Sequence, residues 1–197
     1  MDIKNYVTEK IDSYDVCCQC SFDIISNPRC VTWGGTFDRT CEDPIKLDRN
    51  IDLMLIGQNP WYNEKRHESK NIYGRAFGDK SEKILIDYLT QHNFNPANIW
   101  ITNVVQCSVI NNDPAFVQKA FENCKYFLIE EILLVNPKIL VPMGKVAEKM
   151  LNKVLKSPKL GKLYVYNIYH PNALSYNPQL KQRYHEQFED LKRMVSK

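Results

Sequence analysis

The sequence predicts an α/β fold: a three-layer sandwich with a central four-stranded parallel sheet flanked by helices. Four short apolar runs, each typical of a buried strand, alternate along the chain with segments of helical periodicity. A chain of 197 residues that is 44% hydrophobic and 25% charged is also long enough to bury a core of its own. We therefore expect residues 1–197 to form one domain, with residues 1–50 as a cysteine-bearing N-terminal segment.

Composition narrows the class of protein. The chain has 26 Lys and Arg against 23 Asp and Glu, and its net charge of +3 permits nucleic-acid binding without requiring it. No apolar run approaches the roughly 18 residues of a membrane span, and the first residues lack an apolar signal region. We expect a cytoplasmic or nuclear protein that makes no membrane contact. Seven cysteines, an odd number, favour a metal or redox site over a disulfide framework.

The first half of the chain contains the first strand. Residues 3–16 are expected to form a short helix, Gly34-Gly35 marks a turn, and the polar residues 38–50 are expected to form a surface insertion. Residues 51–57 are an apolar run that ends in Gly, the pattern of a buried parallel strand. A polar loop over 58–78 follows.

Helices and strands then alternate to the end of the chain. A helix over 81–89 carries an apolar face of Ile84, Leu85, Tyr88 and Leu89. A strand over 99–105 precedes a helix that begins at Asp113-Pro114, an N-cap and first-turn pair, and ends near Val135. The remaining expected elements are a strand over 138–144, a helix over 145–155, a strand over 163–169 and a helix over 178–194.

Three of these strands end in residues that are capable of chemistry. Gln58-Asn59-Pro60 follows the first strand, Asn103 lies near the end of the second, and His170 follows the fourth. Ligands of parallel α/β sheets bind beyond the carboxyl ends of the strands. Any one of these residues alone is more simply a polar group in a loop, but three together indicate a site.

Four cysteines have the pattern of a metal centre. Cys17-x-x-Cys20 is a metal-type pair, and Cys107 and Cys124 lie in the second half of the chain. Four thiolates can surround one tetrahedral Zn²⁺ or one iron–sulfur cluster, and the spacing does not separate the two. Taken alone, Cys124 is more simply a small apolar residue on a buried helix face. The remaining cysteines have no obvious partners: Cys18, Cys30 and Cys41.

Several segments, taken in order, have the pattern of a known family. They are Cys17 to Cys20 followed by Val31 to Gly35, Thr102 to Cys107, Cys124 ahead of Leu128 to Ile132, Pro137 to Gly144, and His170-Pro171. The chain resembles the uracil-DNA glycosylase superfamily, most closely its family-four type, which carries a 4Fe–4S cluster. The resemblance runs from about Cys17 to the C-terminus.

The resemblance implies a monofunctional DNA-repair hydrolase. Such an enzyme flips uracil out of DNA and hydrolyses its N-glycosidic bond, which leaves an abasic site. It further implies that Phe77 stacks on the flipped base, Asn103 hydrogen-bonds the base edge, and His170 donates to a carbonyl oxygen of the base. Leu174 would be the wedge that fills the gap in the base stack. The implied cluster ligands are Cys17, Cys20, Cys107 and Cys124, with zinc as the less favoured occupant.

The first motif departs from family four. That family has Gly-Glu-Ala-Pro-Gly where this chain has Gly57-Gln58-Asn59-Pro60-Trp61. An Asn before the Pro is similar to the mismatch-specific and single-strand-selective glycosylases, and it implies that Asn59 positions the attacking water. Gly57 and Gln58 would line the base pocket. Trp61 leaves base preference open between uracil and hypoxanthine or another deaminated or mismatched base.

Two other classes of protein stay open. A catalytically inactive DNA-binding module would keep the pocket without the chemistry, although Asn59 argues against it. A zinc-ribbon-like interaction protein would need a compact local pair of knuckles, whereas Cys107 and Cys124 lie within predicted α/β core segments. The expected partner is DNA that contains uracil or another damaged base, bound by a monomer.

Overall fold

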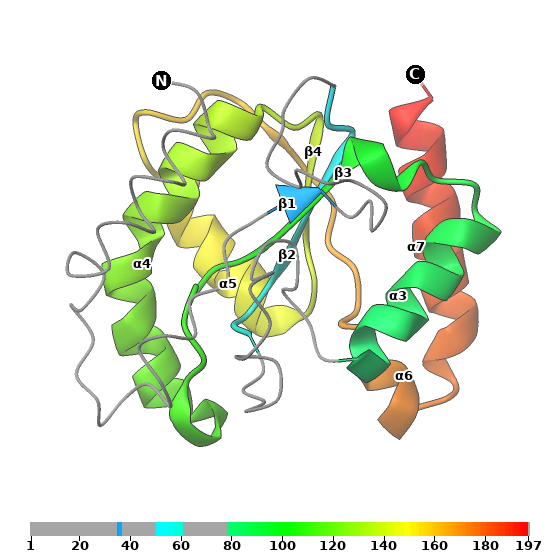
Figure 1. The fold of residues 1–197 in the computed structure, drawn as a ribbon, viewed down its shortest axis with the longest axis horizontal. Coiled ribbons are helices and arrows are strands. Elements are labelled where there is room, and N and C mark those ends of the chain that lie inside the picture. The colour runs from blue at the N-terminus through cyan, green and yellow to red at the C-terminus, as the bar shows by residue number, and fades with distance from the viewer. Residues whose placement is uncertain (1–34, 37–49, 61–78, 197) are drawn as a thin grey trace.

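The computed structural model of the chain describes residues 35–36, 50–60 and 79–196, which form a sheet covered by helices on both faces (Figure 1). The expected helix over 3–16 lies outside the described residues, as does all but Asn50 of the expected insertion over 38–50.

The sheet has five strands. They are β1 (Gly35–Thr36), β2 (Leu53–Gly57), β3 (Ile99–Asn103), β4 (Ile139–Pro142) and β5 (Tyr164–Val165), in the spatial order β1-β3-β2-β4-β5. The pairs among β2 to β5 are all parallel, which confirms the predicted four-stranded parallel sheet.

An antiparallel edge strand was not predicted. Gly35 of β1 pairs with Ile101 of β3, so the prediction of a turn at Gly34-Gly35 is wrong at Gly35. Glycine lacks a Cβ and fits a turn and a close strand edge equally well, so local sequence alone does not separate the two.

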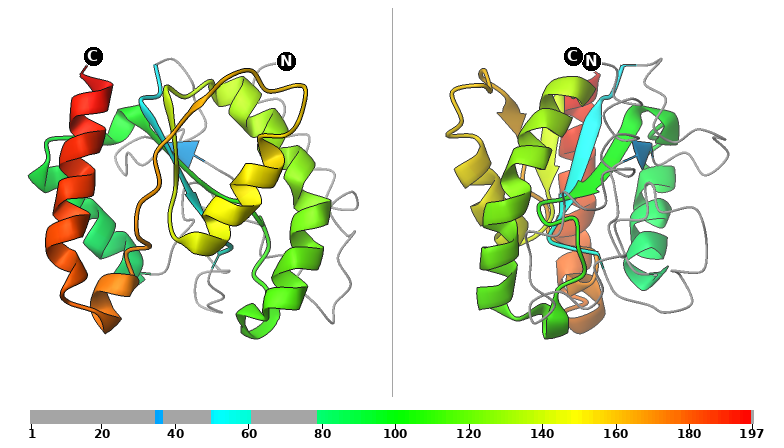
Figure 2. Two further views of the ribbon diagram at one scale, coloured as in Figure 1. Left: turned by 180° about the vertical axis from the view of Figure 1, so that it is seen from behind. Right: turned by 60° about the vertical axis from the view of Figure 1, so that its left-hand side comes forward.

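Five α-helices form the outer layers of the described structure. They are α3 (Asp79–Gln91), α4 (Pro114–Val135), α5 (Lys145–Val154), α6 (Ala173–Tyr176) and α7 (Leu180–Val195), with 3₁₀ turns η2 (Pro96–Asn98) and η3 (Ile110–Asn112) between them. Helices α4 and α5 cover one face of the sheet, and α3 and α7 cover the other (Figure 2). The three-layer sandwich is therefore confirmed.

The two cores meet at the strands. In β2, Met54 and Ile56 pack into the cluster that contains Leu128 of α4, while Leu53 and Leu55 pack into the cluster that contains Phe188 of α7. Successive residues of a strand point to opposite faces of the sheet. Because helices cover both faces here, every residue of β2 is buried and its sequence is a continuous apolar run.

Helix α4 begins and ends as its sequence predicts. The Asp113 side chain accepts hydrogen bonds from the backbone N–H of Ala115 at 2.8 Å and of Phe116 at 3.3 Å, and Pro114 opens the helix. At the other end Asn136 adopts the left-handed conformation, with φ of 46°, and its N–H donates to the Ile132 carbonyl.

Several predicted boundaries need correction. The strand expected over 99–105 ends at Asn103, and the one expected over 138–144 spans only Ile139–Pro142. The helix expected over 178–194 begins at Leu180, after the separate turn α6.

The largest correction concerns the strand expected over 163–169. It is regular only at Tyr164–Val165, although Tyr166 and Ile168 still donate to β4 carbonyls at 3.0 and 3.1 Å. The physical reason is Pro142, which lacks an N–H and removes one donor from the ladder. Within the described ranges, no helix is long and apolar enough to cross a membrane.

Candidate active site

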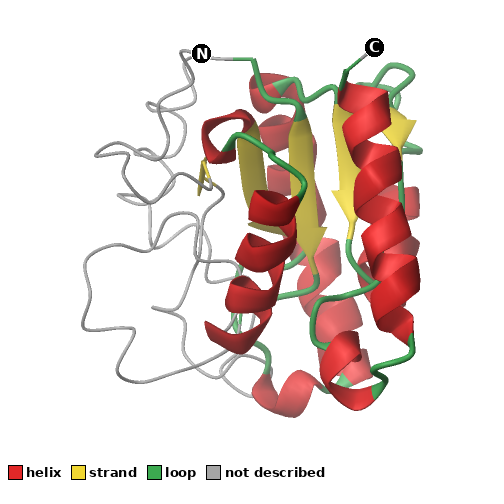
Figure 3. Cartoon of the chain, turned by 90° about the vertical axis from the view of Figure 1, so that its right-hand side faces the viewer, coloured by secondary structure: helices red, strands yellow, loops and turns green. Residues whose placement is uncertain are grey.

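The strand ends singled out in the sequence meet at one edge of the sheet. Gly57 at the end of β2 pairs with Asn103 at the end of β3. Beyond them, the N–H groups of Val104 and Val105 donate to the carbonyls of Gly57 and Gln58, each at 2.9 Å. Figure 3 shows the parallel strands running toward the end of the molecule at which α6 lies.

Strand order makes this edge the expected ligand-binding side of the sheet. Strand β2 lies between β3 and β4, and the chain leaves β2 toward α3 on one face but leaves β4 toward α5 on the other. Loops that diverge in this way leave a crevice at the carboxyl ends of the strands, where α/β sheets bind their ligands.

Gly144 brings His170 to the same edge. The Gly144 N–H donates to the Ile168 carbonyl at 2.9 Å, so the segment before His170 is tied to the end of β4. The φ of Gly144 is +85°, and a Cβ at this position would lie 3.2 Å from the Cβ of His170. Only glycine combines this backbone conformation with this close approach.

Local contacts define the state of the His170 ring. Its Nδ1 accepts a hydrogen bond from the Asn172 N–H at 3.1 Å, so the proton of the neutral ring lies on Nε2. Burial lowers the pKa of His170 below its ordinary value, because the low-dielectric surroundings disfavour the charged ring. The hydrogen bond to Nδ1 and the burial together favour a neutral ring that carries its proton on Nε2.

The side-chain amide of Asn59 is held from three directions. Its Oδ1 accepts from Gln58 Nε2 at 2.8 Å, and its Nδ2 donates to the Pro60 carbonyl at 3.1 Å. The same Nδ2 donates to Oδ1 of Asn112 at 2.9 Å, which links the β2 loop to the turn before α4. These contacts assign the amide orientation: both Nδ2 hydrogens are engaged, and among the described residues one lone pair of Oδ1 receives no donor.

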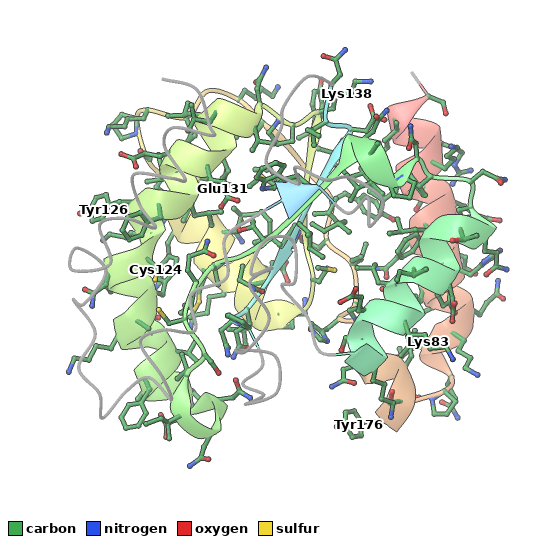
Figure 4. The ribbon with its side chains drawn as sticks, viewed as in Figure 1. Lys83, Cys124, Tyr126, Glu131, Lys138 and Tyr176 are labelled. Atoms are coloured by element: carbon green, nitrogen blue, oxygen red, sulfur yellow. The ribbon has the colours of Figure 1, made fainter. Side chains whose placement is uncertain are left out.

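A buried polar network supports the end of β3. Glu131 of α4 accepts from Trp100 Nε1 at 2.7 Å and from Thr102 Oγ1 at 2.9 Å. Gln106 Nε2 donates to Thr102 Oγ1 at 3.3 Å and to the Asn103 carbonyl at 3.1 Å. Burial raises the pKa of Glu131 to about 7, and the two donated hydrogen bonds offset only part of that rise. Figure 4 shows Glu131 on the sheet-facing side of α4.

Comparison with known proteins identifies the family. The model of the family described as the uracil DNA glycosylase superfamily matches residues 44–192. The chain belongs to this superfamily. Its relatives include three proteins named type-4 uracil-DNA glycosylase, from Archaeoglobus fulgidus, Sulfurisphaera tokodaii and Saccharolobus solfataricus. The chain is 25% identical to the first protein, over 76% of its own length and 80% of that protein. It is 27% identical to the second, over 88% of its own length and 82% of that protein. It is 28% identical to the third, over 78% of its own length and 76% of that protein. The predicted resemblance is thereby confirmed.

Two of the four predicted cluster ligands lie in the part of the chain that the structure describes. Cys107 and Cys124 are each 2% exposed and belong to the same apolar cluster, one after β3 and one on α4. Cys17 and Cys20 lie outside the described residues. No group of three or more metal-binding side chains occurs within the part of the chain that the structure covers. A pair of buried thiols in apolar surroundings fits half of an all-cysteine iron–sulfur site.

The remaining predicted residues differ in their placement. Phe77 lies outside the described residues. Asn103 is fully buried at the end of β3. Leu174 is 6% exposed and packs into the core cluster beneath α6 and α7. The most exposed large apolar side chain described is that of Tyr176, two residues further along.

Three residues that hold the strand ends in place are not predicted from the sequence. The sequence pattern gives Gly144 and Asn112 no role, and it places Glu131 only within a helix. Glu131 carried a signal, because a carboxylate between Leu128 and Val135 lies on the buried stripe of an amphipathic helix. No local signal marks the distant partner of Asn112.

Proposed function

We propose that this protein is a monofunctional uracil-DNA glycosylase. It hydrolyses the N-glycosidic bond of a flipped uracil in DNA and leaves an abasic site. The observation that carries the proposal is the common sheet edge of Asn59, Asn103 and His170, in a chain of the uracil DNA glycosylase superfamily.

The base-binding residues stabilise the departing group. Cleavage of the bond between C1′ and N1 leaves positive charge on the sugar and negative charge on the base, so groups that stabilise the anionic base lower the barrier. His170 donates its Nε2–H to a carbonyl oxygen of the base, which accounts for a neutral ring with its Nδ1 already occupied. Asn103 offers both a donor and an acceptor to the base edge. Phe77 stacks on the base, and Gly57 and Gln58 line its pocket.

Asn59 positions the nucleophile. Its Nδ2 is engaged by Asn112 and by the Pro60 carbonyl, and the remaining Oδ1 lone pair accepts a hydrogen from a water molecule. The oxygen of that water bonds to C1′ while the C1′–N1 electron pair leaves with the base. The water loses one proton to solvent, and the base anion takes up one.

We propose that Cys17, Cys20, Cys107 and Cys124 hold a 4Fe–4S cluster, with zinc as the alternative. The buried thiols of Cys107 and Cys124 support this assignment. When bound, the cluster supplies a structural tie between the N-terminal segment and α4, and it takes no part in hydrolysis.

Metal analysis tests the ligand set. The Cys17→Ser and Cys124→Ser variants should each lower bound iron and the melting temperature before they alter base preference. Cys30→Ser is the matched control and should retain both. Normal metal content in the first two variants would refute the four-cysteine assignment.

We further propose that residues 1–197 act as one domain and as a monomer, in the cytoplasm or the nucleus. The partner is DNA, and the mildly basic net charge of +3 is compatible with it.

Base release from defined oligonucleotides tests the activity. Each oligonucleotide carries one uracil, hypoxanthine, xanthine or mismatched thymine, in single- and double-stranded form, and Asn59→Ala is the control variant. Uracil release that the variant abolishes is the expected result. Release of another base alone would keep the mechanism but change the substrate, an outcome that the unusual Asn59-Pro60-Trp61 segment makes worth testing. DNA binding without any release would favour an inactive binding module.

A further inference from the structure

Leu174 and Tyr176 lie on the same short helix but in opposite surroundings. Leu174 is 6% exposed and packs in the core cluster with Ile168 and Tyr184. Tyr176 is 83% exposed, more than any other large apolar side chain described. In Figure 4 its ring stands clear of the ribbon at the end of the molecule where α6 lies.

Helix α6 holds Tyr176 at a fixed offset from His170. The Ala173 N–H donates to the His170 carbonyl at 2.9 Å, and the Asn177 N–H donates to the Ala173 carbonyl at 2.9 Å. Leu174 anchors the turn from beneath. The exposed ring of Tyr176 lies on a turn whose backbone is hydrogen-bonded to the His170 carbonyl. The ring is therefore preorganised beside the candidate active site.

We propose that Tyr176, and not Leu174, enters the base stack at the gap that a flipped nucleotide leaves. This inference rests on the proposed function. Flipping a base out of a duplex costs its stacking interactions, and an inserted side chain replaces part of them. The ring of Tyr176 can stack on a neighbouring base without sequence preference, because every base has a π-face.

Leu174 is poorly suited to this role. To reach DNA it would have to leave the apolar cluster under α6, which would open a cavity and release the turn that it anchors. Tyr176 needs no such rearrangement, since its side chain is already in solvent.

Base release by Tyr176 variants, measured as kcat/KM on duplex and on single-stranded uracil DNA, tests the inference. Tyr176→Ala should lose roughly tenfold or more on the duplex, while Tyr176→Phe should stay near wild type because the ring carries the interaction. The single strand has little stacking to replace, so the loss there should be much smaller.

A pyrene nucleotide opposite the uracil provides a rescue readout. Pyrene fills the gap from the other strand, so it should restore release by Tyr176→Ala. A folding defect or a lost phosphate contact would not be restored. Tyr164→Ala is the matched control: Tyr164 is 69% exposed on β5, where the strands begin, and its loss should leave the kinetics unchanged.

The outcomes separate the inference from the function on which it rests. No release by the wild-type protein from any uracil substrate would refute both. Release that Tyr176→Ala leaves intact, or reduces equally on both substrates without pyrene rescue, would refute this inference alone. Leu174→Ala should lower the melting temperature. If that variant lost base release on the duplex alone and pyrene restored it, Leu174 would be the side chain that enters the base stack.

Discussion

Asn112 accepts a hydrogen bond from Asn59 across 53 residues of sequence, at 2.9 Å. Asn112 and its neighbour Asn111 both adopt left-handed backbone conformations, with φ of 52° and 50°. Asparagine tolerates this region better than most residues, and the turn presents the side-chain Oδ1 of Asn112 to the loop after β2. The proposed water-positioning amide is thus oriented by a residue from a different strand connection.

Asn112→Gly should slow base release without unfolding the turn. Glycine accepts the left-handed conformation, so the variant removes the side-chain acceptor alone. A typical hydrogen bond contributes about 0.5–1.5 kcal/mol, so kcat should fall by roughly two- to tenfold. Asn112→Asp keeps an acceptor and should retain more activity. Kinetics on uracil DNA for both variants decide the point, and an unchanged kcat in Asn112→Gly would contradict the positioning role.

Gly144→Ala should damage both stability and activity. The new Cβ meets the His170 Cβ at 3.2 Å on a backbone with φ of +85°. With ψ of 165° the backbone lies in a region that is essentially restricted to glycine, so an alanine costs roughly 1–3 kcal/mol before any clash, the melting temperature should fall and His170 should shift. Gly161→Ala is the matched control, since a Cβ there meets nothing within 4 Å. Equal melting temperatures for the two variants would refute the close-approach argument.

Glu131→Gln should change how stability depends on pH. Burial raises the pKa of Glu131 in the folded state to about 7, from 4.5 in the unfolded chain. A carboxyl with a raised folded pKa contributes its full stability below pH 4.5 and loses it as pH rises to about 7. Denaturant unfolding should therefore show wild type losing roughly 3 kcal/mol relative to Glu131→Gln across this window. Parallel pH curves for the two proteins would contradict the buried, shifted carboxyl.

His170 should be neutral with its proton on Nε2 near neutral pH. The Asn172 N–H occupies Nδ1, and burial lowers the pKa of the ring. Nitrogen-15 NMR of the imidazole, assigned with His170→Gln, reports the tautomer directly. A ring protonated at Nδ1 above pH 6.5 would exclude the proposed donor role. Because the folded pKa is lowered, this group costs stability only as pH falls below 6.5.

Sequence reasoning predicted the layers and the strand ends because both depend on local patterns. Apolar runs mark β2 and β3, the Asp113-Pro114 cap marks α4, and parallel strands bring their carboxyl ends together. It failed where the outcome depends on a distant partner. The loss of regular structure after Val165 depends on Pro142 of the neighbouring strand, and the burial of Leu174 depends on how α6 packs. The roles of all the predicted site residues stay predictions, and Phe77, Cys17 and Cys20 also lie outside the described residues.

The alternation of β2 between two cores limits how this site can evolve. One residue inserted within Leu53–Gly57 would exchange the side chains that face α4 for those that face α7, and both cores would fail together. Changes in base preference are therefore expected as substitutions in the segments beyond the strand, such as the one that begins at Gln58, and not as insertions within it. The strands can thus keep the same number of residues while the base preference of the site changes.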